Sequence, residues 1–109
     1  MMIVLLSVLL AAASPAVPSD MLGTWSSGSC TDSSKLLVIT ATTAKMGTEP
    51  AAAIVYVPDD AGAGNGAIHW KEEGSVDNFV YVADVKKLVH NTQGYGMPGK
   101  VAYVRCPST

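Results

Sequence analysis

The side chains suited to nucleophilic, acid–base or metal chemistry are few and lie far apart in the chain. The two histidines, His69 and His90, stand alone, and so do the two cysteines, Cys30 and Cys106. A catalytic zinc site normally takes three protein ligands, and once the cysteines are paired no third ligand accompanies the histidines. Catalytic triads are recognised by geometry, so a hydrolase using either histidine stays one hypothesis, although no G-x-S-x-G elbow is present. The sequence favours a protein without catalytic activity, cofactor or metal.

Two acidic pairs, Asp59-Asp60 and Glu72-Glu73, and the glycine-rich run Ala61–Gly66 match no complete binding motif. A calcium loop carries oxygen ligands at alternate positions, whereas alanines stand there after the first pair. Six extended residues between the pairs span about 20 Å, too far for one metal or for glycosidase carboxyl groups, which lie about 5–9 Å apart. A phosphate-binding P-loop ends in Gly-Lys-Ser/Thr, but Ala67 follows Gly66. We interpret all three segments as solvent-exposed turns or loops.

The N-terminal segment has the features of an export signal. Residues 1–19 carry no charge, and Ile3–Ala13 is a predominantly apolar stretch of eleven residues followed by small ones. A membrane-spanning helix needs about 20 apolar residues, whereas this length suits a signal peptide with an A-x-A-like cleavage site. We predict a signal peptide over residues 1–16, cleaved after Ala16, and a periplasmic or secreted protein. Cleavage after Ala13 also fits, and no Lys or Arg precedes the stretch. The alternative is a buried first strand or helix.

The remaining residues, 17–109, form one small domain by their length. They hold both cysteines, and export to an oxidising compartment predicts a Cys30–Cys106 disulfide. In the chain-entropy model a loop of this size adds about 4–5 kcal/mol of stability. Two free thiols or a redox pair are the alternatives, but redox pairs usually read C-x-x-C. Seven basic and nine acidic side chains leave a net charge of −2, which argues against nucleic acid as a partner.

Short apolar stretches separated by Gly, Pro, Asp and Ser predict strands rather than helices. They are Leu22–Trp25, Lys35–Ala41, Thr43–Met46, Ala51–Val57, Ala67–Lys71, Val76–Ala83 and Val101–Cys106. Val85, Leu88 and Val89 have helical spacing after Asp84, but the same residues fit a strand with a bulge, which we prefer. The fold class is therefore all-β: a small antiparallel meander or up-and-down barrel, partly or wholly closed, of about six to eight strands, stapled by one disulfide.

Large aromatic side chains supply the predicted core, because an exported monomer would not expose them all. They are Trp25, Trp70, Phe79, Tyr81 and Tyr103. Within the segment from Val76, the aromatics alternate with Val80 and Val82, so that strand is expected to be covered on both sides. In the last strand, if the set with Ala102, Val104 and Cys106 points inward, the disulfide is buried and Arg105 is exposed.

Gly23-Thr24-Trp25 resembles the G-x-W near the first strand of calycin-type barrels, the lipocalins, avidins and small bacterial metalloprotease inhibitors. The resemblance implies a small barrel in which the Trp packs across the closed end. The inhibitors also carry a Cys shortly after the Trp, as Cys30 does here. Their second Cys is near in sequence, whereas Cys106 lies at the far end of this chain.

Surface loops are the predicted binding elements. The two longer glycine-rich loops, Pro58–Gly66 and Asn91–Gly99, offer Asn65, Tyr95 and Met97 as contacts, and exposed loops are where binding tends to reside. Ligand pockets usually need about 300–1,000 Å³, a volume that short strands carrying large aromatics leave little room for. We therefore expect an exported binding module for an envelope or extracellular protein, such as an inhibitor. The alternatives are a carrier of a small apolar ligand inside the barrel and the hydrolase.

Overall fold

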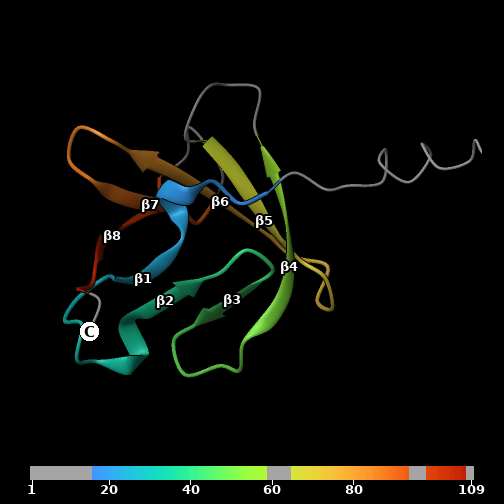
Figure 1. Cartoon of the computed structure of the whole chain (residues 1–109), viewed down its shortest axis with the longest axis horizontal. Helices are drawn as coiled ribbons and strands as arrows, with labels where there is room; N and C mark the ends of the chain where they lie inside the picture. Colours follow the sequence, from blue (N-terminus) through green and yellow to red (C-terminus); the bar gives the residue numbers. More distant parts are fainter. Residues whose placement is uncertain (1–15, 59–64, 94–97, 108–109) are drawn as a thin grey trace, which may run out of the picture.

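The described part of the chain forms eight strands whose side chains point alternately inward and outward. The computed structural model describes residues 16–58, 65–93 and 98–107. The strands are β1 Gly23–Ser26, β2 Leu36–Ile39, β3 Thr43–Met46, β4 Ala52–Pro58, β5 Asn65–Trp70, β6 Val76–Val82, β7 Lys87–Asn91 and β8 Lys100–Arg105. Each is antiparallel to the next, and β8 pairs with β1, so the described strands close into a barrel (Figure 1). The all-β prediction is confirmed, with a fully closed barrel.

Helical structure is limited in the described residues to two single turns. The 3₁₀ turns are η2 Ser19–Met21, just before β1, and η3 Ser33–Lys35, just before β2. No helix in the described ranges is long and apolar enough to cross a membrane. The predicted signal peptide lies outside the described residues except for Ala16, and the next side chain, Val17, is buried in the core.

The segment after Asp84 is a turn followed by a strand, so the helical alternative is wrong and the preferred strand begins only at Lys87. β7 starts at Lys87 and pairs with both β6 and β8. Val85 lies in the preceding turn, where Lys86 has a positive φ of 53°. Helical spacing appeared because the turn shifted the alternation by one residue, so that Leu88 points inward and Val89 outward.

Two residues assigned to the glycine-rich loop belong to β5 instead. Asn65 and Gly66 open this strand, and Gly66 pairs with Pro58 on β4 and with Phe79 on β6. A Cβ atom on Gly66 would lie 2.0 Å from the Tyr56 hydroxyl oxygen and 2.3 Å from Cζ of that ring. The glycine is required because the buried Tyr56 ring crosses the β5 backbone at this point.

The barrel interior is filled by side chains. Trp25, Trp70, Phe79 and Tyr103 are buried, and Tyr81 is partly buried against the same core. Aliphatic residues from five strands complete it: Leu37, Ile39, Ala44, Ile54, Ile68 and Leu88. Eight-stranded barrels have an interior just wide enough for side chains, and here large ones occupy it.

In the last strand, Ala102 and Val104 do not point inward, which contradicts the condition of the prediction, although Cys106 is buried and Arg105 is exposed as it stated. Tyr103 points into the core, whereas Val104 is 52% exposed on the outside. Both sets of alternate residues contain apolar side chains, so alternation alone did not decide between them. On β6, Val80 and Val82 are only half-buried, because a single-layered barrel has solvent on its outer side; the expectation of cover on both sides is wrong.

Trp25 closes the end of the barrel at which β1 begins. Its side chain is fully buried, and its Nε1 donates to the Met21 carbonyl of η2 at 3.0 Å. The Arg105 guanidinium lies 4.2 Å from the Trp25 ring centroid and donates to the carbonyls of Leu22 (2.5 Å) and Asp20 (2.7 Å). A Cβ on Gly23, whose φ is +124°, would lie 2.7 Å from Arg105 Nη1. The closed barrel and its capped end are compatible with a calycin-like small barrel.

The predicted disulfide is present. Cys30 and Cys106 are bonded, with their Cα atoms 5.8 Å apart and a sequence separation of 76. Cys30 lies in the β1–β2 connection and is exposed, whereas Cys106 follows β8 and is buried. The bond therefore fastens the first connection of the barrel to its last strand.

Candidate functional site

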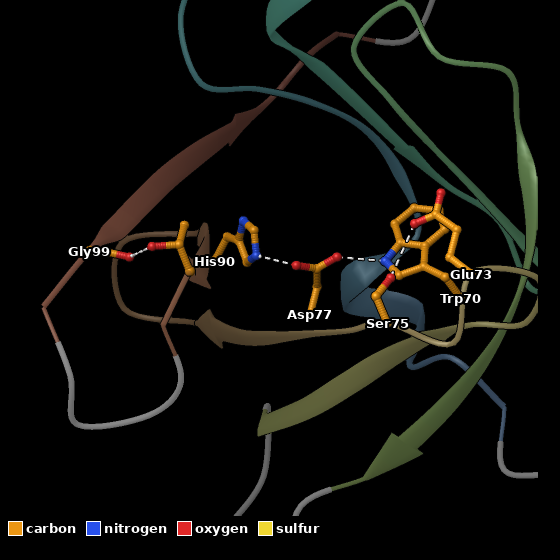
Figure 2. Close-up of polar contacts among 7 residues, drawn as sticks. Trp70, Glu73, Ser75, Asp77, His90 and Gly99 are labelled. Carbon is orange, nitrogen blue, oxygen red and sulfur yellow. Dashed lines mark hydrogen bonds and ion pairs between the residues drawn. The ribbon is translucent and has the colours of Figure 1, made fainter.

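A polar cluster interrupts the apolar interior. Asp77 of β6 points inward because it stands two residues before the buried Phe79, on the same face of the strand, and Phe79 pairs with His90 on β7. His90 Nε2 lies 2.9 Å from Asp77 Oδ1, and Trp70 Nε1 at the end of β5 donates to Asp77 Oδ2 at 2.5 Å. Figure 2 shows the carboxylate between the two rings, with one oxygen directed at each. Three neighbouring strands thus supply one connected hydrogen-bond network.

Burial and ring packing hold this network in place. The His90 side chain is 11% exposed and the Asp77 side chain 27%. The imidazole also stacks on the Phe79 ring, with centroids 4.7 Å apart and the planes 21° from parallel. Because a carboxylate only accepts hydrogen bonds, His90 donates through Nε2–H, which fixes the proton on that nitrogen.

The environment keeps Asp77 ionised. The hydrogen bond from His90 lowers the pKa of the Asp77 carboxyl, and the bond from Trp70 acts in the same direction, together outweighing partial burial, which raises it. The Tyr103 hydroxyl shows the reverse effect, since burial and then the negative charge of Asp77 raise its pKa. Asp77 is therefore a negative charge inside the barrel wall, held by two donors.

A pocket of about 520 Å³ opens beside this cluster, at the end of the barrel opposite Trp25. The β3–β4 connection forms one wall through residues 46 and 49–53, and the β5–β6 turn forms the other. Trp70 and Asp77 belong to both the cluster and the pocket lining. We call this hollow the mouth pocket.

Carboxylates dominate the charge of the mouth pocket. Glu49, Glu72, Glu73 and Asp77 line it, and Ser75 donates to the Glu73 carboxylate at 3.2 Å. The uncharged wall consists of Met46, Pro50 and three alanines, 51–53. The pocket thus combines an acidic rim with a small apolar wall. No group of three or more potential metal ligands occurs in the described part of the chain.

The residues predicted to bind are not gathered here. Asn65 is half-buried at the start of β5, near the end of the barrel opposite the mouth pocket. Tyr95 and Met97 lie outside the described residues. His69 faces outward on β5 while His90 faces inward on β7, so the two histidines do not share a site.

The Asp77–His90 pair was missed from sequence, although part of its signal was present. Asp77 stands two residues before Phe79, a predicted core residue, so the period of a strand places its carboxylate on the inner face. A buried carboxylate requires a donor, but which strand provides it depends on register. A second hollow, of about 510 Å³, is bordered by Val55 and Tyr56 of β4 and by Ala16.

Comparison of the chain with family models, with curated proteins and with solved structures finds no match.

Proposed function

We propose that this chain is an exported binding module that engages a partner protein at the mouth pocket, where it takes a basic side chain of that partner. The observation that carries this proposal is the combination of a filled barrel interior with an open, acid-lined pocket at one end. Binding then takes place at connections between strands, as expected for a protein partner. The connections are β3–β4 and β5–β6 rather than the two glycine-rich loops.

The pocket chemistry selects a cationic group on a flexible stem. Glu72 and Glu73 at the rim attract a Lys or Arg head group, and ionised Asp77 adds negative charge deeper in. Met46 and Pro50 offer apolar contact to the methylene groups of such a side chain. Charge-assisted hydrogen bonds to carboxylates are roughly twice as strong as neutral ones, and those formed in a partly enclosed pocket are less screened by salt.

The other two hypotheses receive less support. A carrier of a small apolar ligand needs an apolar cavity, but large core side chains fill the interior and the mouth pocket is bordered by carboxylates. A hydrolase needs a nucleophile beside a histidine, whereas the hydrogen-bond partner of His90 is the Asp77 carboxylate.

The two tryptophans offer a direct test by NMR, because each gives one indole N–H signal. Trp70 lies in the pocket, and Trp25 lies at the opposite end, bonded to a backbone carbonyl. N-acetyl-arginine amide is titrated into the labelled protein, with the uncharged isostere N-acetyl-citrulline amide as the matched ligand. We expect the chemical shift of the Trp70 indole N–H to change saturably with the arginine compound and not with the citrulline compound. The Trp25 signal is expected to stay at the same chemical shift with both.

Variants separate the pocket from general charge effects. The double variant Glu72→Gln/Glu73→Gln is expected to bind the arginine compound about tenfold more weakly, which corresponds to a loss of about 1.4 kcal/mol in binding free energy. Asp84→Asn removes an exposed charge in the β6–β7 turn, at the other end of the barrel, and is expected to leave the affinity unchanged. Equal response to both compounds, or equal loss in both variants, would refute the proposed function.

A further inference from the structure

Charge is divided unevenly between neighbouring parts of the barrel. Residues 49–84, which include β4–β6, hold seven acidic side chains and one basic one, a net charge of −6. Residues 85–109, which include β7 and β8, hold four basic side chains and no acidic one, a net charge of +4. Two adjoining regions of one small protein therefore carry opposite charge.

The outer surface where these regions meet carries apolar side chains at two places. Val80, Val89 and Ala102 stand in one row across β6, β7 and β8, and Val104, which is 52% exposed, follows two residues beyond Ala102. Val76, which is 46% exposed, lies on the other side of the polar row Asn78, Asn91 and Lys100. We call this outward surface, together with Lys100 and the Glu72-Glu73 turn, the β6–β8 face. Apolar groups exposed together on a soluble domain mark interaction surfaces.

The strand register places Val76 between a positive and a negative group. Lys100 pairs with Asn91, which pairs with Asn78, two residues beyond Val76 on β6. Two strand spacings across and two residues along put the Lys100 Cα about 12 Å from that of Val76. Glu73 precedes Val76 by three residues, a reach of at most about 11 Å on the other side along the strand. Lys100 and Glu73 thus lie in opposite directions along β6 from the valine, each with its Cα within about 12 Å of the Val76 Cα.

We propose that the β6–β8 face binds a second copy of this chain about a twofold axis that passes near Val76. Such an axis brings the two Val76 side chains together and sets Lys100 of each copy against the Glu72-Glu73 turn of the other. The contact occurs twice and closes on itself, as an isologous interface must. The positive group, Lys100, and the negative groups, Glu72 and Glu73, are both present on this one face.

Other occupants fit this face less well. An anionic membrane or a nucleic acid would be attracted by Lys100 but repelled by Glu72 and Glu73 beside the same valine. A barrel surface is convex, so only the strands next to β6 make contact, and interfaces of small area belong to weak complexes. The expected dimer is therefore concentration-dependent and sensitive to salt.

Sedimentation velocity on the purified, oxidised protein tests the proposal. Between about 10 and 500 µM, a range that brackets weak complexes, we expect the average mass to rise from monomer toward dimer. Raising the ionic strength from 0.02 to about 0.5 M is expected to weaken association, because the Debye length falls from above 20 Å to below 5 Å. A protein that stays monomeric throughout at low salt overturns the proposal.

Charge exchange identifies the interface. Lys100→Glu and Glu73→Lys are each expected to weaken self-association about tenfold or more, since like charges then face each other twice. An equimolar mixture of the two variants is expected to associate as the natural protein does, because every contact in the mixed dimer again joins opposite charges. Lys35→Glu, at an exposed position in η3, is the matched control and is expected to change nothing.

The proposed dimer and the proposed function share Glu72 and Glu73, and Lys100→Glu separates them because Lys100 does not line the mouth pocket. This variant is expected to lower self-association while the Trp70 signal still moves saturably with the arginine compound. Failure of the mixture to restore association overturns the proposed dimer. So does binding of the protein to vesicles of phosphatidylcholine and phosphatidylglycerol that Lys100→Glu abolishes while self-association persists.

Discussion

Replacing Gly66 by alanine tests how the Tyr56 ring is packed against β5. The new methyl group would lie 2.0, 2.3 and 2.4 Å from Oη, Cζ and Cε1 of that ring, distances at which the ring must move. Tyr56 is buried and its hydroxyl donates to the Asn65 carbonyl at 3.3 Å, so movement strains the core. Overpacking of this kind costs about 1–3 kcal/mol. We expect Gly66→Ala to lose about 2 kcal/mol, despite the entropic advantage of alanine in a strand.

Urea denaturation followed by circular dichroism measures this loss, and a double-mutant cycle assigns it. In a Tyr56→Leu background the side chain ends short of the ring atoms concerned, so Gly66→Ala is expected to cost less than 0.5 kcal/mol there, a coupling of about 1–2 kcal/mol. Gly28→Ala is the control, because its Cβ would come no closer than 3.4 Å to any atom. An equal loss of stability with Tyr56 and with leucine at this position would refute the packing argument.

Three further changes probe the staple, the polar cluster and the closed end. Cys30→Ser is expected to lower the free energy of unfolding by about 2–5 kcal/mol; thiol titration of the unfolded, oxidised natural protein should find no free thiol. The pKa of the Asp77 carboxyl is lowered, so the ionised carboxylate stabilises the fold above the ordinary pKa of 3.8, and this stabilisation is lost as pH falls through the folded-state pKa. Asp77→Asn is expected to flatten the decline in the free energy of unfolding by urea between about pH 5 and 2. An unaltered slope would contradict this. Arg105→Ala removes a charged group over Trp25 and two hydrogen bonds to carbonyls. It is expected to lower the free energy of unfolding by about 1–3 kcal/mol in urea denaturation and to change the near-UV circular dichroism spectrum. A variant as stable as the natural protein would show that the Arg105 contacts contribute nothing to stability.

The fold class could be predicted because strand periodicity is local. Phe79 and Tyr81 stand two residues apart, as do Leu37 and Ile39, and such spacing is visible without any knowledge of pairing. Strand ends shifted by one or two residues where a neighbouring strand extended the ladder, as it does for Asn65 opposite Val80. The direction faced by β8 was missed because valine and tyrosine side chains occupy its two faces in turn.

The candidate site could not be predicted to the same degree, because it depends on contacts between strands. Asp77 and His90 are 13 residues apart in sequence, and only the register of β6 against β7 brings them together. The mouth pocket requires two connections, β3–β4 and β5–β6, to lie side by side at one end of a closed barrel. No local pattern records that arrangement, although the two-residue spacing between Asp77 and Phe79 would have placed the carboxylate inside.

The β1–β8 pairing differs in kind from the other seven, since it alone joins strands from the two ends of the sequence. Its formation from an open chain requires closing a loop of most of the domain, a search whose entropic cost rises with the logarithm of loop length. The Cys30–Cys106 bond spans nearly the same stretch. An oxidised unfolded chain is therefore already a ring, in which β1 and β8 are near neighbours before any strand has formed. The bond thus makes the most distant pairing in the barrel a short-range event, and the oxidised chain should refold faster than the reduced one.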